Sequence, residues 1–210
     1  MGILFRIVIG FFCMLGVAQA EIIAPDALIK TTADEVIAII KQDKDIQAGN
    51  QKKTLALVDA KVLPHFNFAR MTQSAAGRYW RTAAAEQKQA LTAEFRNMLV
   101  RTYTKAFTVY RDQTVEVKPP RMVADATEVT IKTVINKPGA QPITVDYEME
   151  KTADGWKVYD VSIEGVSMAA SYRGTFASEI QEKGIDGLIK TLADRNASAA
   201  NAPLRKAETK

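Results

Sequence analysis

The sequence contains one cysteine, Cys13, and one histidine, His65. Cys13 lies in an amino-terminal segment that we expect to be removed, so the mature chain would contain no disulfide and no thiolate nucleophile. A single histidine excludes metal sites built from several histidines. The chain also lacks an HExxH sequence, a glycine-rich phosphate loop and a nucleophile elbow. The sequence therefore predicts no metal and no cofactor, and it favours binding over catalysis.

The most apolar segment is too short to span a bilayer. Ile7–Val17 follows the basic residue Arg6 and is shorter than the roughly 20 residues that a transmembrane helix needs. The sequence Ala18-Gln19-Ala20 comes next and matches the small-x-small pattern that signal peptidase recognises. We therefore predict that residues 1–20 are a signal peptide, cleaved after Ala20, and that the mature protein is secreted. An uncleaved anchor is the alternative.

Concentrated charge is absent as well. The formal net charge is +4, and basic residues are mixed with acidic ones along the chain, unlike the clustered basic surface of a nucleic-acid-binding protein. The length suits one domain, which we place at residues 21–196. Residues 197–210 are mostly small and polar, show no periodicity and are predicted to form a disordered tail.

Apolar residues at helical spacing predict helices in both halves of the chain. The predicted helices of the first half start at Pro25, cover Ala48–Leu63, run from the N-cap Asn67 to Gly77, and cover Ala83–Tyr110. After Gly165, two further helices are predicted, and Gly184 separates them.

Four segments between these helices alternate apolar and polar residues, as strands do. They are Thr114–Lys118, Thr127–Ile135, Ile143–Lys151 and Trp156–Glu164. Short turns between them imply antiparallel neighbours. Asp146, Glu148 and Glu150 share one face of the third strand, so that face should be wet and the other dry. The predicted fold class is α+β, with a four-stranded antiparallel twisted sheet packed on one face by several helices.

Few side chains are candidates for chemistry. His65 is close to Phe66 and Phe68, and a structural histidine is a simpler interpretation than a general base. The three carboxylates of the third strand are better explained as a solvated face than as an acid/base pair. Aromatic and methionine residues, in contrast, are abundant on faces that should meet, and pattern alone does not separate a packed core from a lined cavity.

Several stretches resemble the MlaC family, also called the toluene-tolerance auxiliary protein family. The resemblance is carried by Gly77–Arg81, Trp156–Ser167 and Tyr172-Arg173 with Phe176, and Phe66–Met71 also fits. It extends over nearly the whole mature chain, from about Pro25 to Ala193. Ser171 and Thr175 depart from the residues that the resemblance leads us to expect at those positions.

The resemblance implies a periplasmic, non-enzymatic carrier that holds a phospholipid in an apolar pocket between sheet and helices. Such a carrier shuttles lipid between the outer and inner membranes and maintains the lipid asymmetry of the outer membrane. The implied partners are an inner-membrane ABC transporter complex, contacted through its MCE-domain subunit, and an outer-membrane lipoprotein associated with a porin. Arg101 and Arg173 are candidates for the headgroup rim. The residues expected to contact lipid are Trp80, Phe95, Met98, Leu99, Tyr103, Phe107, Val129, Ile131, Tyr147, Met149, Val161, Ile163, Val166, Tyr172 and Phe176.

Two other hypotheses remain open on the sequence. The chain could be a small enzyme whose cavity holds an apolar substrate beside Asp160, Tyr159 or His65, because a fold of this kind permits either role. It could also be an adaptor of the cell envelope, in which all the apolar residues simply fill the core.

Overall fold

The computed structural model describes residues 22–107, 112–123 and 125–201, without the side chains of 105–107 and 200–201. The predicted signal peptide, residues 1–20, lies outside the described residues. The predicted tail lies outside them from residue 202 onward.

The first elements of the described residues are three helices, α1 (Pro25–Gln42), α2 (Lys44–Gln47) and α3 (Gln51–Lys61). Pro25 opens α1, where its fixed φ suits a first turn. The helix predicted from Ala48 starts three positions later, because Gly49 adopts a left-handed φ of 87° and the Asn50 side chain caps α3 by accepting from the Lys53 N–H.

The next segments are the 3₁₀ turn η1 (Leu63–His65) and the helices α4 (Phe68–Ala76), α5 (Tyr79–Thr82) and α6 (Ala85–Phe107). The predicted cap is confirmed, since the Asn67 side chain accepts from the Arg70 N–H at 3.1 Å. Gly77 ends α4 with a positive φ of 56°. The short helix α5 was not predicted, because one turn is too short to show periodicity.

The sheet contains five antiparallel strands in the order of the sequence, β1 (Thr114–Val117), β2 (Glu128–Asn136), β3 (Ile143–Thr152), β4 (Gly155–Ile163) and β5 (Val166–Ser167). The antiparallel α+β fold is confirmed, but the predicted number of four strands is too low. Glu164 and Gly165 both have positive φ and form a tight hairpin turn, after which β5 pairs with β4. A strand of two residues is too short to show alternation, so its pattern could not reveal it.

The last described element is α7 (Met168–Asn201), which is interrupted by non-helical backbone at Gly184 (φ 74°). The two predicted helices are therefore the two halves of α7. The second half continues through Asn201, beyond the predicted start of the tail, in an alanine-containing segment of high helix propensity.

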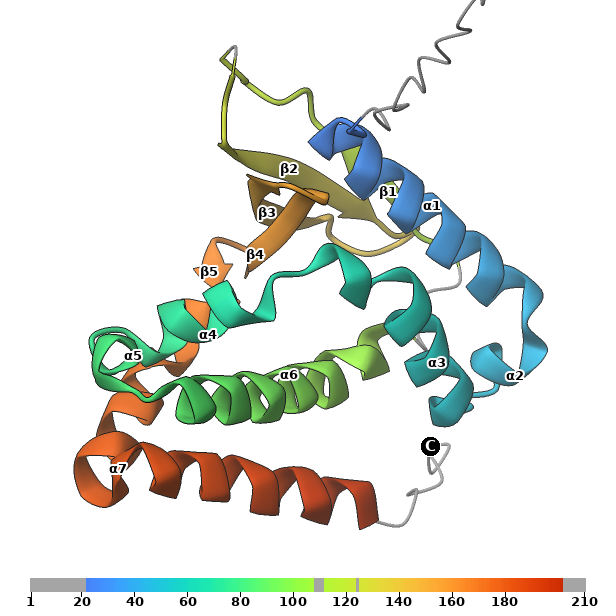
Figure 1. The fold of residues 1–210 in the computed structure, drawn as a ribbon. Coiled ribbons are helices and arrows are strands. Elements are labelled where there is room, and N and C mark those ends of the chain that lie inside the picture. The colour runs from blue at the N-terminus through green and yellow to red at the C-terminus, as the bar shows by residue number, and fades with distance from the viewer. Residues whose placement is uncertain (1–21, 108–111, 124, 202–210) are drawn as a thin grey trace, which may run out of the picture.

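The elements form two layers (Figure 1). The helix α1 lies beside β1 and β2, whereas α4, α6 and α7 pack against one another in a separate helical layer. One apolar cluster lies among the helices and contains Phe95 and Phe176, and a second lies on the sheet and contains Ile131 and Met149. Phe66 and Met168 pack against both clusters and so lie between the two layers.

Candidate functional site

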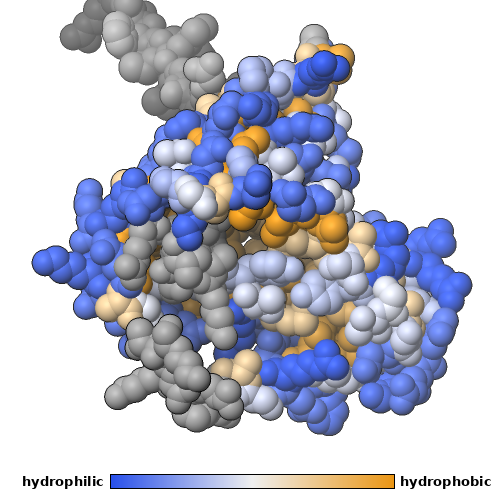
Figure 2. All heavy atoms as spheres, turned by 180° about the vertical axis from the view of Figure 1, so that it is seen from behind, coloured by the Kyte–Doolittle hydropathy of each residue, from blue (hydrophilic) through white to orange (hydrophobic). Residues whose placement is uncertain are grey.

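An apolar cavity of about 250 Å³ lies between the sheet and the helices. Its wall combines residues of α1, α3, η1, α4, α6 and the four strands β1–β4, together with Met168 at the start of α7. Seen from behind, apolar side chains gather around a hollow in the surface between the two layers (Figure 2). The full lining is Leu28, Ile29, Thr32, Ala33, Val36, Ile37, Ile40, Val58, Val62, Leu63, His65, Phe66, Phe68, Met71, Leu99, Val100, Tyr103, Thr104, Val115, Ile135, Val145, Tyr147, Val158, Val161, Ile163 and Met168.

The sheet side of this wall follows from strand alternation. Tyr147 of β3 lies opposite Ile131 of β2 and Val161 of β4, so these side chains share the inner face of the sheet. Val145 pairs with Ile163 in the same way. The dry face predicted from the sequence is therefore the face that borders the cavity.

The helix side of the wall comes largely from α1. Leu28, Ile29, Val36 and Ile37 all line the cavity, which makes the apolar stripe of α1 wider than a single row of packed residues. The helix α6 closes the other side with Leu99, Val100 and the two residues that follow one turn later.

The cavity contains polar atoms but no charge. Its polar side chains are Thr32, His65, Tyr103, Thr104 and Tyr147, and no Asp, Glu, Lys or Arg is among the lining residues. Burial and, secondarily, the nearby Lys157 lower the pKa of His65, so the neutral imidazole is favoured. A wall of this kind can bury an apolar ligand and form a few neutral hydrogen bonds, but it offers no acid/base pair.

The structure brings together only some of the residues expected to contact lipid. Those that line the cavity are Leu99, Tyr103, Tyr147, Val161 and Ile163. Phe95 and Phe176 are fully buried in the helical cluster, where Phe95 meets Phe176 and Tyr172 edge-on at 5.1 and 5.2 Å between ring centroids. Trp80 and Met98 pack against the same cluster.

The remaining expected contacts lie on or near the sheet. Ile131 and Met149 are fully buried in the sheet cluster, and Val129 packs against it. Val166 is 63% exposed on β5. The side chain of Phe107 lies outside the described residues.

The two arginines expected at a headgroup rim do not line the cavity. Arg173 lies on α7 beside Gly77, and its Nε donates to the Ser74 carbonyl at 3.1 Å. Arg101 is a half-buried residue of α6.

Sequence reasoning missed the contribution of α1 and α3 to the wall. The missed apolar residues of α1, of α3 and of the turn that follows α3 are Leu28, Ile29, Ala33, Val36, Ile37, Ile40, Val58, Val62 and Leu63. A signal was present, because α1 has adjacent apolar pairs such as Leu28-Ile29 and Val36-Ile37. Pairs of this kind widen the apolar face of a helix beyond what one packing partner covers.

The three residues weighed for an enzyme lie in different surroundings. The Asp160 carboxylate accepts from the N–H groups of Val161 and Ala169 at 2.8 and 3.1 Å and from the Ser167 hydroxyl. It therefore anchors the start of α7 to β4. Tyr159 lies on the opposite, outer side of the sheet, and only His65 lines the cavity.

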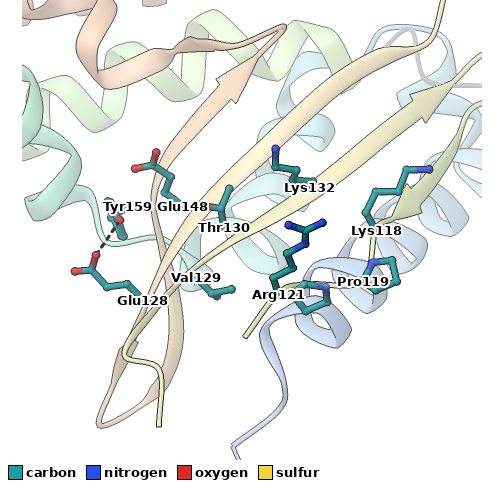
Figure 3. A pocket seen from close by; sticks show the side chains of 10 residues that line it. Lys118, Pro119, Arg121, Glu128, Val129, Thr130, Lys132, Glu148 and Tyr159 are labelled. Atoms are coloured by element: carbon teal, nitrogen blue, oxygen red, sulfur yellow. Dashed lines mark hydrogen bonds between the residues drawn. The ribbon is translucent and has the colours of Figure 1, made fainter. Parts of the chain in front are cut away.

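A second hollow, a groove of about 720 Å³, lies on the outer face of the sheet (Figure 3). Its lining is Lys118, Pro119, Pro120, Arg121, Glu128, Val129, Thr130, Lys132, Glu148 and Tyr159. Because charged side chains of both signs border it, this groove suits polar groups rather than acyl chains.

The electrostatics of the groove depend on Arg70. Its guanidinium pairs with Glu128 at 2.6 Å and Glu150 at 2.5 Å and lies 3.6 Å from the centre of the Tyr159 ring. The hydrogen bond from Arg70 lowers the pKa of Glu128. Burial, followed by the charges of Glu128 and Glu148, raises the pKa of Tyr159 to about 12, so its hydroxyl stays protonated.

Within residues 22–107, 112–123 and 125–201, no group of three or more His, Cys, Asp or Glu side chains could hold a metal ion. In the same part of the chain, no helix combines the length and the apolar character that crossing a membrane requires.

Fold and cavity together define an α+β protein that binds an apolar ligand between a curved antiparallel sheet and a helical layer. The chain belongs to the MlaC family, because the family model of the MlaC protein matches residues 30–194.

Relatives of known sequence and structure agree with this assignment. The intermembrane phospholipid transport system binding protein MlaC of Haemophilus influenzae is 27% identical over 79% of each chain. The toluene tolerance protein ttg2D of Pseudomonas putida is 23% identical, with 85% of this chain and 86% of the relative covered. A phospholipid-binding protein from Ralstonia solanacearum, solved in complex with a phospholipid, is 42% identical with a TM-score of 0.77, covering 84% of this chain and 98% of the other.

Proposed function

We propose that this protein is a periplasmic carrier that takes the acyl chains of a phospholipid into the cavity and shuttles the lipid between the outer and inner membranes. The observation that carries the proposal is the uncharged, apolar cavity between the two layers. The relative from Ralstonia solanacearum, which is similar over most of the chain, was solved with a phospholipid, and this supports the same ligand here.

The physical need for such a carrier is large. Two acyl chains contain on the order of 30 CH₂ groups, and exposing each of them to water costs about 0.8 kcal/mol. Free diffusion of a phospholipid across an aqueous gap is therefore negligible, and a protein wall that replaces the bilayer interior removes most of this cost.

The wall must also adapt to its ligand. At about 250 Å³ the cavity is smaller than the roughly 300–1,000 Å³ of pockets that enclose drug-sized ligands. A lipid with two chains therefore has to displace wall residues when it enters. Met71 and Met168 line the cavity, and methionine side chains re-pack with little strain.

The rest of the proposal concerns place and partners. The predicted signal peptide with cleavage after Ala20 supports a periplasmic location. The name of the relative from Haemophilus influenzae, an intermembrane phospholipid transport system, supports partners at both membranes. We propose an inner-membrane ABC transporter complex with an MCE-domain subunit on one side and an outer-membrane lipoprotein-porin complex on the other. The absence of charged side chains from the lining favours a carrier without enzymatic activity.

Filling the cavity tests the proposal. Val161 lines the cavity, and Val161→Trp should exclude acyl chains from it. Thr130→Trp is the matched control, since Thr130 lies on β2 of the same sheet and is exposed on its outer face. Each variant is purified without detergent and examined by native mass spectrometry and circular dichroism. We expect bound phospholipid in the wild type and in Thr130→Trp, and a folded but lipid-free Val161→Trp. Wild-type protein that stays empty after incubation with phospholipid vesicles would contradict the proposal.

A further inference from the structure

Thr104 of α6 differs from four other helical threonines in how its hydroxyl is bonded. Thr54, Thr72, Thr92 and Thr102 each donate their hydroxyl to the backbone carbonyl four residues earlier, at 2.7–2.9 Å. This is the usual way in which a threonine within a helix satisfies its hydroxyl. The Thr104 hydroxyl makes no such bond.

The Thr104 hydroxyl is also buried. Thr104 is 2% exposed, and in the described part of the chain only its Oγ1 and the Gln113 Oε1 are buried side-chain atoms without a hydrogen-bond partner. A buried hydroxyl without a partner costs about 1–3 kcal/mol. Thr104 lines the cavity and Gln113 does not, so the missing partner of Thr104 can come from a ligand.

The chemistry of the cavity narrows the choice of this partner. A carboxylate in the cavity would need a cation nearby, and none of the lining residues is Lys or Arg. A neutral acceptor carries no such requirement. In a phospholipid, the neutral acceptors next to the acyl chains are the ester carbonyls, which cannot donate hydrogen bonds themselves and so complement a hydroxyl donor.

We propose that the Thr104 hydroxyl donates a hydrogen bond to an ester carbonyl of the bound lipid and thereby sets how deep the acyl chains enter. This inference rests on the proposed function, because it assigns a residue to recognition of the same ligand. Thr104 then selects ester-linked over ether-linked lipids, which have the same chains and headgroup but lack the carbonyl.

The test compares ester- and ether-linked phosphatidylglycerol with equal chains, offered as vesicles to delipidated protein. In the wild type, we expect the ester-linked lipid to bind about 3- to 10-fold more tightly, as one net hydrogen bond provides. Thr104→Val has nearly the same shape but no hydroxyl, so the preference should fall to about 1. Thr104→Ser keeps the hydroxyl and should keep the preference.

Thr102→Val is the control, because Thr102 lies on the same helix, is exposed, and bonds its own backbone. It should leave the ratio at the wild-type value. Equal ester-to-ether ratios in the wild type and Thr104→Val would overturn the assignment of Thr104. Failure of the wild type to bind either lipid would instead overturn the proposed function.

Thermal unfolding of the lipid-free proteins adds a second readout. Thr104→Val should be at least as stable as the wild type, since it removes an unpartnered hydroxyl, and a marked loss of stability would show that the hydroxyl serves the fold instead.

Discussion

The two faces of the sheet differ in kind although they are built from alternate residues of the same strands. On β2, Ile131 is 0% exposed on the inner face, whereas the adjacent Thr130 and Lys132 are exposed on the outer face. The inner face borders the apolar cavity, and the outer face carries the charged groove. Strand alternation therefore determines which side is dry, but the elements packed on that side determine whether it is filled or hollow.

The inner face itself shows this second effect. Ile131 and Met149 are fully buried within the sheet cluster and do not line the cavity. Further along the same face, Ile135 and Val145 border the cavity. Residues of one type and one periodicity are thus core in one place and cavity wall in another.

We expect the largest loss of stability when a charged side chain is placed on the dry inner face of the sheet. Ile131→Lys places an ammonium group on the dry face without a partner, and it should lower the free energy of unfolding by at least about 3–5 kcal/mol. Urea unfolding followed by circular dichroism measures the change. Thr130→Lys inserts the same side chain one residue earlier on the wet face, opposite Glu148, and should change stability by less than about 0.5 kcal/mol. Similar losses in both variants would mean that the two faces are not distinguished as described.

The same contrast explains what could be predicted from the sequence. The acidic residues of β3 fixed the wet face correctly, since Asp146, Glu148 and Glu150 lie opposite the cavity side. Helix boundaries set by local chemistry, such as the Asn67 cap and the end at Gly77, were also predictable. Each of these features depends on a few neighbouring residues.

The cavity wall was only partly predictable, because it depends on how distant elements pack. Phe95 and Phe176 have the large, inward-facing side chains that suggest a lipid contact, yet they pack edge-on against each other in the helical cluster. Val36 and Ile40 have the ordinary pattern of a packed helix, yet they line the cavity. A stripe of apolar residues predicts which face of a helix or strand is buried, but it does not predict whether that face packs against a neighbour or lines a cavity.

Substitution of Asp160 should cause a loss of stability of intermediate size. Asp160 pairs in register with Glu148, yet it is 7% exposed because β5 and the start of α7 cover it. Asp160→Ala leaves the N–H groups of Val161 and Ala169 and the Ser167 hydroxyl without their acceptor, and it should cost about 2–3 kcal/mol of stability. Asp160→Asn keeps one acceptor oxygen and should cost about half as much by the same urea assay. If Asp160→Asn lost more stability than Asp160→Ala, Asp160 would not act as the acceptor that anchors the start of α7.

The smallest expected effect concerns the outer face and its response to pH. Burial, followed by the charge of Asp160, raises the pKa of Glu148 above its ordinary value. A carboxyl group with a raised pKa in the folded state opposes folding when it is ionised, so the penalty is present at neutral pH and disappears as pH falls through the raised pKa. Solvent screens this partly exposed group, and Glu148→Gln should therefore stabilise the protein at neutral pH by only a few tenths of a kcal/mol.

The stabilisation by Glu148→Gln should shrink as pH is lowered and vanish once Glu148 of the wild type is protonated and therefore also neutral. Urea midpoints measured for both proteins from neutral to acidic pH provide the comparison. Glu128→Gln is the opposite control, because its neighbour Arg70 lowers the pKa of Glu128, and ionised Glu128 therefore supports folding. Glu128→Gln should destabilise at neutral pH, and its effect should also fade in acid. In this charge pattern, burial and the charge of Asp160 disfavour the ionised form of Glu148, whereas Arg70 stabilises the ionised form of Glu128. If both variants shifted stability in the same direction, the charge pattern assigned to the outer face would be wrong.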